Sequence, residues 1–184
     1  MQDAPGTAAV RPERPGERAA VIAVHRVAFG PRGDVVADLV VDLLTTSPHG
    51  ALSLVAERRG SLIGHVLLTP ALLEAPERRV DVRVLSPLAV APDARRRGVG
   101  SALVRSALER LDDDGVPAVF LEGDPAYYAR FGFLAAGPLG FRKPSPRIPD
   151  EAFQVARLGS YAPWMTGTLV YSESFWRHDA VGPR

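Results

Sequence analysis

Two kinds of apolar spacing alternate along the chain. In some stretches apolar residues recur every three or four positions, as on one face of a helix, and in others they form short continuous or alternating runs, as in strands. Helices are predicted at 18–29, 34–47 and 98–112. Strands are predicted at 9–12, 52–57, 62–69, 80–90, 116–121, 153–158 and 165–171. This mixture of strands and helices is typical of an α/β domain.

Turn residues predict how these elements are joined. Gly30-Pro31 ends the first helix, and Asp34 is expected to cap the second. Residues 58–61 form a compact turn, so the strands on either side of it are predicted to make an antiparallel hairpin. Residues 70–79 and 134–149 are predicted to be loops. The last two strands are expected to form another hairpin around 159–164.

The length of the chain suits one domain. A chain of 184 residues can bury one sizeable core, and we expect that domain to span 9–175, with a loose tail at 1–8 and a C-terminal tail at 176–184. Residues 1–18 carry charges among prolines and glycines and have no continuous apolar segment, and no stretch of the sequence is apolar over the ~18 residues needed to span a bilayer. The sequence therefore predicts a cytoplasmic protein without a membrane partner.

Composition excludes several classes of function. The formal net charge is +1, from 22 basic and 21 acidic residues, which does not favour a nucleic-acid partner. The absence of cysteine excludes disulfides, thiolate zinc sites and a cysteine nucleophile. The four histidines lack ligand-like spacing, so no metal site is expected. His65 lies within an apolar strand and is predicted to be a hydrogen-bonded structural residue.

Residues 88–101 join a predicted strand to a predicted helix through a basic, glycine-containing turn. The first turn of a helix has N–H groups without intrahelical acceptors and carries a partial positive charge, so it favours an anion such as phosphate. Gly98 and Gly100 let the backbone approach that anion closely. The spacing excludes the mononucleotide P-loop, which needs a lysine before Ser101, and the dinucleotide pattern, which needs a small residue in place of Leu103.

A second motif follows the strand at 116–121. Asp124 before Pro125 is a good helix start, and the short helix that it begins is expected to end at Gly132. Tyr128 lies within that helix. A phenol at this position is able to act as a general acid.

Together these two motifs resemble the GNAT family of N-acetyltransferases. Arg95-x-x-Gly98-x-Gly100 resembles its acetyl-CoA pyrophosphate loop, and the sequence Gly-Asp-Pro-x-Tyr-Tyr-x-Arg-Phe-Gly-Phe at 123–133 is similar to its YhbS-like bacterial subgroup. The resemblance extends from about Val10 to Tyr171. It implies the GNAT acyl-CoA N-acyltransferase fold, an α/β structure in which helices flank a mixed central sheet that splays between the strands ending at Val90 and Leu121 to bind CoA.

The resemblance also implies a co-substrate and site residues. Acetyl-CoA, without a metal, would pair through its pantetheine with the strand before the loop and through its pyrophosphate with the loop amides. The implied cofactor-binding residues are Leu88, Ala89, Val90, Arg95, Arg96, Arg97, Gly98, Val99, Gly100 and Ser101. Tyr128 is the implied general acid. Glu122 is the candidate for the base or for binding the amine, with His65, Ser86 and a water chain as open alternatives.

The predicted reaction is transfer of the acetyl group to a primary amine of an unidentified small molecule or peptide. Direct attack in a ternary complex is expected, because the chain has neither cysteine nor a Gly-x-Ser-x-Gly elbow. The alternatives are a non-catalytic acyl-CoA sensor and a transferase of longer acyl groups. The family is compatible with a homodimer formed through an edge strand, which the residues do not show. Phe141, Trp164 and Trp176 are expected to pack in the core or on the surface and not to line an acceptor pocket.

Overall fold

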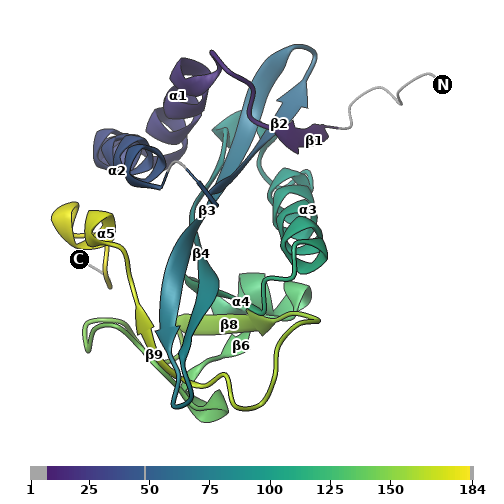
Figure 1. Ribbon diagram of the computed structural model, residues 1–184. Coiled ribbons are helices and arrows are strands. Elements are labelled where there is room, and N and C mark those ends of the chain that lie inside the picture. Colours follow the sequence, from purple (N-terminus) through teal and green to yellow (C-terminus); the bar gives the residue numbers. More distant parts are fainter. Residues whose placement is uncertain (1–7, 48, 183–184) are drawn as a thin grey trace. The chain divides into compact units, whose positions relative to one another are not determined.

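The computed structural model describes residues 8–47 and 49–182 (Figure 1). Most of the predicted tail at 1–8, and Pro48 at the predicted end of the second helix, lie outside these residues. The elements are β1 (Ala9–Pro12), α1 (Arg18–Phe29), η1 (Gly30–Arg32), α2 (Gly33–Thr46), β2 (Leu52–Arg58), β3 (Ser61–Glu74), β4 (Arg79–Val90), η2 (Pro92–Ala94), α3 (Val99–Asp113), β5 (Ala118–Glu122), α4 (Pro125–Tyr128), η3 (Ala129–Phe131), β6 (Leu134–Ala135), η4 (Gly137–Leu139), β7 (Phe141–Arg142), β8 (Phe153–Arg157), β9 (Gly167–Val170) and α5 (Glu173–Arg177).

The described residues form a mixed sheet with flanking helices, and they fall into two compact units. Strands follow the order β1-β2-β3-β4-β5-β8-β6, and β9 pairs with β3 and β7. Unit 1 contains residues up to 67 and residues 87–107, and unit 2 contains residues 68–86 and those from 108 onward. The predicted α/β fold class is confirmed.

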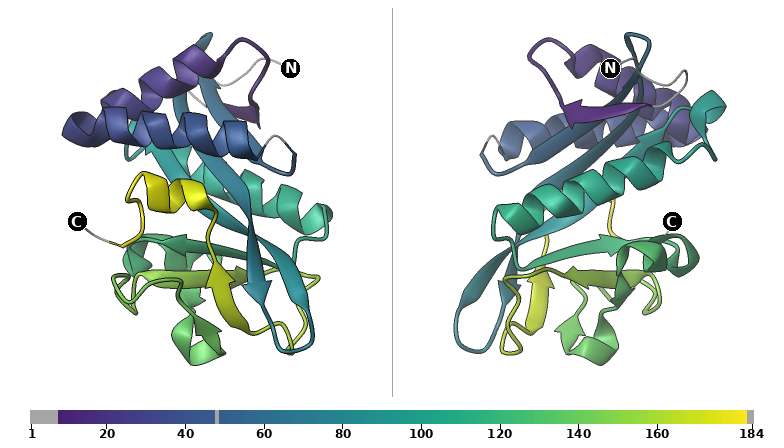
Figure 2. Two further views of the ribbon diagram at one scale, coloured as in Figure 1. Left: turned by 60° about the vertical axis from the view of Figure 1, so that its left-hand side comes forward. Right: turned by 90° about the vertical axis from the view of Figure 1, so that its right-hand side faces the viewer.

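In unit 1, helices cover both faces of the strands. Helices α1 and α2 lie side by side on one face, and α3 begins on the other (Figures 1 and 2). Two adjacent residues of β3 show this arrangement. A Cβ at Gly64 would lie 3.0 Å from side-chain atoms of Leu103 and Val99 on α3, whereas His65 contacts His25 on α1. Successive side chains of a strand point to opposite faces, so Gly64 faces α3 and His65 faces α1.

The crossing of α1 and α2 depends on Gly33. A Cβ at this position would lie 2.2 Å from the carbonyl oxygen of Arg26, so only glycine allows the helices to approach this closely. Helix α2 starts at Gly33, and the prediction that Asp34 caps it is wrong. The η1 turn continues directly into α2 with helical φ at Gly33, which places Asp34 in the first turn. There its carboxylate accepts a 2.8 Å hydrogen bond from Arg26 Nε.

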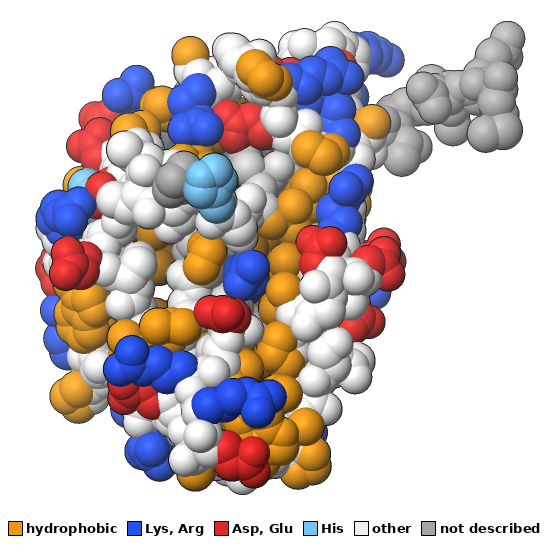
Figure 3. Space-filling view, in the orientation of Figure 1, with side chains coloured by type: hydrophobic (Ala, Val, Ile, Leu, Met, Phe, Trp, Pro, Cys, Tyr) orange, Lys and Arg blue, Asp and Glu red, His pale blue; other side chains and the backbone are white. Residues whose placement is uncertain are grey.

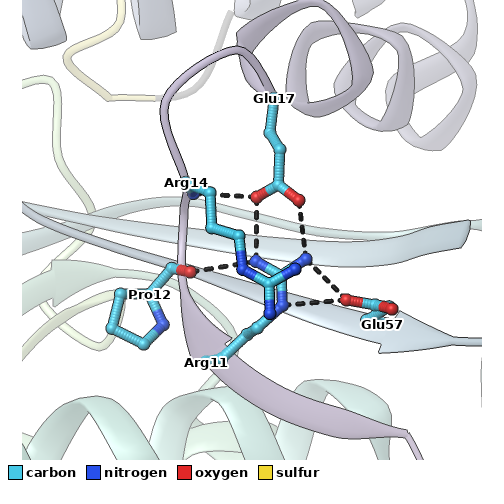
Figure 4. A network of polar contacts seen from close by, with 5 residues as sticks. All are labelled: Arg11, Pro12, Arg14, Glu17 and Glu57. Carbon is cyan, nitrogen blue, oxygen red and sulfur yellow. Dashed lines mark hydrogen bonds and ion pairs between the residues drawn. The ribbon is translucent and has the colours of Figure 1, made fainter. Parts of the chain in front are cut away.

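Arg11 ties β1 to β2 and to the start of α1 (Figure 4). Its guanidinium donates to both carboxylate oxygens of Glu17 and, through Nε at 2.8 Å, to Glu57 on β2. Glu17 also accepts a 2.8 Å hydrogen bond from the backbone N–H of Arg14. Because the carboxylate is held by these donors, chiefly Arg11, the pKa of Glu17 falls to about 2. The cluster fixes the path of the chain from β1 into α1.

In unit 2, β5 lies between β4 and β8. The pairing of β4 with β5 is parallel and joins Arg83 to Val119 and Val84 to Phe120. Pairing of β5 with β8 is antiparallel from Ala118 to Glu122. Phe120 packs edge-on against Phe141 and parallel to Phe153, and this aromatic cluster forms much of the core of the unit.

The predicted loop at 70–79 is shorter than expected, at 75–78, and the predicted final hairpin is wrong. Strand β3 continues through Pro70 to Glu74, since alternate residues there are buried and β9 provides an antiparallel partner. Strand β8 pairs with β5 and β6 and not with β9. A Cβ at Gly167 would lie 2.0 Å from the carbonyl oxygen of Glu74, so the glycine allows β9 to lie close beside β3.

The segment 134–149 is also more ordered than predicted, with β6, η4 and β7 within it. Phe141 is 3% exposed and belongs to the core, as expected. Trp164 lies under the Arg78 guanidinium, 4.6 Å from its ring centre, and Trp176 is 47% exposed on the surface. The residues placed in a C-terminal tail include the end of α5 and the fully buried Val181.

Candidate functional site

The glycine loop of unit 1 has the backbone of an anion cradle. Strand β4 ends at Val90, and the N–H of Ala102 in the first turn of α3 donates to the carbonyl of Gly98, the residue before the helix. The amides just before it have no acceptor in the helix. Arg96 and Gly98 have positive φ, 57° and 80°, separated by one residue with negative φ. Alternation of this kind turns successive N–H groups toward one point and makes an anion-binding concavity.

The three arginines of the loop have different surroundings. The Arg95 side chain donates from Nη2 to the carbonyl of Ala28 at 2.5 Å and from Nε to the carbonyl of Val90 at 3.2 Å. It therefore ties the end of α1 to the end of β4. Arg96 is exposed, and Arg97 lines two neighbouring cavities. Arg97 therefore faces space that a ligand could occupy.

A basic cavity adjoins the glycine loop. Its volume is about 490 Å³, and its lining is Arg58, Arg59, Ser61, Ile63, Asp93 and Arg97. A second cavity of about 210 Å³ shares Arg58 and Arg97 and reaches Gly98. Arg58 and Arg59 were not expected here from the sequence, because the end of β2 and the turn that follows it lie far from the loop in sequence. The available signal was the pair of adjacent arginines in a tight turn.

In unit 2, Tyr128 lies at the end of α4. The Asp124 carboxylate accepts a 2.9 Å hydrogen bond from the N–H of Ala126, and Gly132 ends the following turn with φ 87°, so both predicted ends of this helix are confirmed. The Tyr128 ring is half-buried, with Phe133 edge-on at 5.6 Å. Burial first, and then the nearby Tyr127, raise the pKa of Tyr128 above its ordinary value of 10. The phenol therefore keeps its proton at neutral pH.

Glu122, at the end of β5, has both carboxylate oxygens engaged. The hydroxyl of Tyr171 donates to one oxygen at 2.9 Å, and the N–H of Gly182 donates to the other at 2.9 Å. Burial raises the pKa of Glu122, while these hydrogen bonds and the charge of Arg147 oppose the rise. The side chain is thus biased toward taking up a proton, and its orientation is fixed by the C-terminal segment.

A chain of hydrogen bonds runs through His65. His25 Nε2 lies 2.7 Å from His65 Nδ1, and His65 Nε2 lies 2.8 Å from Ser53 Oγ. Ser53 donates its only proton to the Glu13 carboxylate, so it must accept from His65, and His65 must accept from His25. This order leaves the buried His25 Nδ1 with a lone pair and without a donor. His65 is fully buried and hydrogen-bonded through both ring nitrogens, as predicted.

The remaining charges form no concentrated field on the face drawn in Figure 3, where basic and acidic side chains are interspersed. Within residues 8–47 and 49–182, no group of three or more His, Asp or Glu side chains is placed to hold a metal ion. None of the helices in this described part of the chain combines the length and the apolar character needed to cross a bilayer.

Comparison with known proteins identifies the class. Residues 9–136 match the family model described as the acetyltransferase (GNAT) domain. The chain belongs to this family of N-acetyltransferases and is an acyltransferase.

Similar proteins and structures agree with that assignment. The uncharacterised N-acetyltransferase YhbS of Escherichia coli is 35% identical over 170 residues, which cover 91% of this chain and 98% of YhbS. Its relative YjhQ from the same organism is 39% identical over 124 residues, covering 67% of this chain and 66% of YjhQ. The crystal structure of YhbS in complex with CoA superposes with a TM-score of 0.86 at 33% identity, over 100% of this chain and 99% of that one.

A GNAT acetyltransferase from Brucella melitensis, solved in complex with acetyl-CoA, superposes with a TM-score of 0.70 at 30% identity, over 91% and 97% of the two chains. Both solved relatives thus contain CoA or its acetyl thioester. The candidate residues are distributed over the two units of this chain: the glycine loop belongs to unit 1, and Glu122 and Tyr128 belong to unit 2.

Proposed function

We propose that this protein transfers the acetyl group of acetyl-CoA to a primary amine of a small molecule or peptide by direct attack in a ternary complex. The observation that carries the proposal is the backbone of the glycine loop, with positive φ at Arg96 and Gly98 immediately before α3. Strained conformations of non-glycine residues cluster at ligand sites, and Arg96 is such a residue. Two solved relatives contain CoA or acetyl-CoA, which supports the same assignment.

The residues present fit that co-substrate. Amides from Arg95 to Ser101 would bind its pyrophosphate, with Arg96 and Arg97 adding positive charge. The backbone of Leu88, Ala89 and Val90 would pair with the pantetheine amides, because the pairs that join β4 to β5 lie earlier, at Arg83 and Val84. The carbonyl of Val90 already accepts a hydrogen bond from Arg95 Nε. When bound, acetyl-CoA supplies an activated acetyl carbon and a thiolate leaving group.

The transfer would involve two proton steps, one to the leaving sulfur and one from the amine. The amine nitrogen bonds to the acetyl carbon as the carbon–sulfur bond breaks, and Tyr128 gives its phenolic proton to the departing sulfur. The raised pKa of Tyr128 means that the proton is present at neutral pH. Glu122 would take the proton that the amine loses, or hold the amine as its ammonium ion, and the raised pKa of its carboxyl group favours proton uptake.

The test is release of free CoA thiol from acetyl-CoA across a panel of amines: polyamines, amino acids, aminoglycosides, peptide N-termini and lysine peptides. We expect one class to drive release, and we expect Tyr128→Phe to slow it by about ten-fold or more, as loss of a general acid does. Tyr127→Phe is the matched control, since it removes a hydroxyl from the same short helix and leaves the proposed acid in place.

Two results would contradict the proposal. If acetyl-CoA binds but no amine accelerates thiol release, the protein is an acyl-CoA sensor. If Tyr128→Phe and Tyr127→Phe behave alike, Tyr128 is not the acid. Release from longer acyl-CoA thioesters, measured in the same assay, decides the acyl group that the protein prefers.

A further inference from the structure

The Tyr128 ring lies directly against the backbone of Gly123. A Cβ on Gly123 would be 2.4 Å from Cε2 and 2.8 Å from Cδ2 of that ring, far inside the roughly 3.5–4.0 Å of a carbon–carbon contact. The φ of Gly123 is not in the left-handed region, so any residue could adopt this backbone conformation. Glycine is required here for space alone, and the space is filled by the ring of the proposed acid.

Both backbone polar groups of Gly123 are hydrogen-bonded to the neighbouring segment at 152–154. Its N–H donates to the carbonyl of Ala152 at 3.0 Å, and its own carbonyl accepts a 2.9 Å hydrogen bond from Gln154 Nε2. Gln154 is only 1% exposed and lies in β8, which pairs with β5 along its length. The backbone at Gly123 is therefore anchored to the sheet, and a larger side chain would displace the tyrosine ring before it displaced the strand.

Three other rings limit where Tyr128 could move. Tyr127 stands edge-on to it at 4.9 Å, Phe133 at 5.6 Å and Phe131 at 6.4 Å between ring centroids. Phe133 is 1% exposed, so that side of the ring meets the core. The phenol is thus placed by contact with rings and with the bare backbone of Gly123.

We propose that Gly123 and Gln154 are positioning residues that set the place of the Tyr128 phenol. The inference rests on the proposed function, in which Tyr128 is the general acid. Gly123 provides the surface on which the ring lies, and Gln154 holds that surface at the end of β5. Neither residue exchanges a proton with substrate. Their effect on the reaction passes through Tyr128, because a misplaced catalytic group loses rate without any change in its chemistry.

The first test is a double-mutant cycle on the rate of thiol release with the amine found in the panel. We expect Gly123→Ala to lower kcat by about ten-fold or more with the dissociation constant of acetyl-CoA unchanged. In the Tyr128→Phe background, Gly123→Ala should have little further effect on the rate, since the hydroxyl whose position it changes is already absent. Gln154→Met should show the same dependence on Tyr128. Gly137→Ala is the control, because its Cβ would meet nothing within 4 Å and its φ is not left-handed.

The second test needs no acceptor. The chain has four tyrosines, so ring-¹³C-labelled protein gives a tyrosine spectrum that single Tyr→Phe variants can assign. Gly123→Ala should shift the Tyr128 ring signals more than those of Tyr127, Tyr161 and Tyr171. Gly137→Ala should leave all four in place.

The outcomes separate this inference from the proposed function. If Tyr128→Phe leaves the rate unchanged, the assignment of the acid fails, and the spectrum still decides whether Gly123 positions the ring. If Tyr128→Phe slows the reaction but Gly123→Ala does not, the inference is overturned. It is also overturned if the two effects simply multiply, or if the Tyr128 signals stay where they are.

Discussion

Three adjacent residues of the same type, the arginines of the glycine loop, have different contacts. The sequence presents Arg95, Arg96 and Arg97 as one basic run. The structure gives Arg95 two backbone carbonyls as acceptors, those of Ala28 and Val90, and leaves Arg97 beside a cavity. No sequence pattern distinguishes these roles, since they depend on where a helix end 67 positions away comes to lie.

The His25–His65 pair makes stability depend on pH. Burial lowers the pKa of His25 from its ordinary value of 6.5 to about 4, and the pKa of His65 is also lowered, by burial first and then by His25. Below pH 6.5 these two histidines therefore bind protons in the unfolded chain but stay neutral in the folded chain. The stabilisation is fully present above pH 6.5 and is lost as the pH falls toward 4.

We expect the free energy of unfolding to fall by about 2 kcal/mol between pH 7 and pH 5, from the linkage of one such histidine. Urea unfolding at a series of pH values measures it, and the window lies above the range in which most carboxylates titrate. In His25→Gln the dependence should be weaker. A flat profile in the wild type, or the same slope in both proteins, would show that the pair does not stay neutral in the fold.

At the element scale, the C-terminal segment is part of unit 2. Val181 is fully buried, and the N–H of Gly182 donates to Glu122. Gly182 has φ 76°, and a Cβ there would lie 2.8 Å from Arg147, so the segment is closely packed. It fixes a carboxylate to which the proposed function gives a role.

Deletion of residues 179–184 should therefore lower the free energy of unfolding by about 2 kcal/mol, mostly from the lost burial of Val181. It should also reduce turnover, because Glu122 loses the amide that orients it. Chemical denaturation and the thiol-release assay measure the two effects. Deletion of residues 183–184 alone is the matched control, and if both deletions give equal stability, the segment does not contribute to the fold.

Elements with strong local signals were predicted well, and long-range pairing was not. Asp124, Pro125 and Gly132 fix the ends of a short helix within a few residues, and the structure confirms them. The partner of β9 depends on the fit of Gly167 against the carbonyl of Glu74, which no neighbouring residue indicates. A hairpin was the natural prediction for two adjacent strands, and it was wrong because β9 pairs with β3, whereas β8 pairs with β5 and β6.

The molecule as a whole is nearly neutral. The net charge is +1, and the charges on the face shown in Figure 3 are mixed, so attraction of an anionic co-substrate has to come from local features. Those features are the loop amides, the start of α3 and the arginines at 58, 59 and 97. The glycine motif was readable from sequence because its geometry is local. The contribution of Arg58 and Arg59 was not readable from sequence, because the β2–β3 hairpin brings them to the cavity beside the glycine loop.

The account depends most on binding of acetyl-CoA at the glycine loop, and calorimetric titration measures this directly. Gly98 and Gly16 both belong to unit 1, both have positive φ, and a Cβ at either would meet nothing within 4 Å. Alanine at either position should cost similar stability, about 1 kcal/mol. Only Gly98→Ala should weaken acetyl-CoA binding, by about ten-fold or more, because its Cβ and its strained φ disturb the anion cradle.

The wild type should bind acetyl-CoA, Gly16→Ala should bind it equally well, and Gly98→Ala should bind it poorly. The account is contradicted if the wild type does not bind acetyl-CoA, or if Gly98→Ala binds it as tightly as Gly16→Ala does.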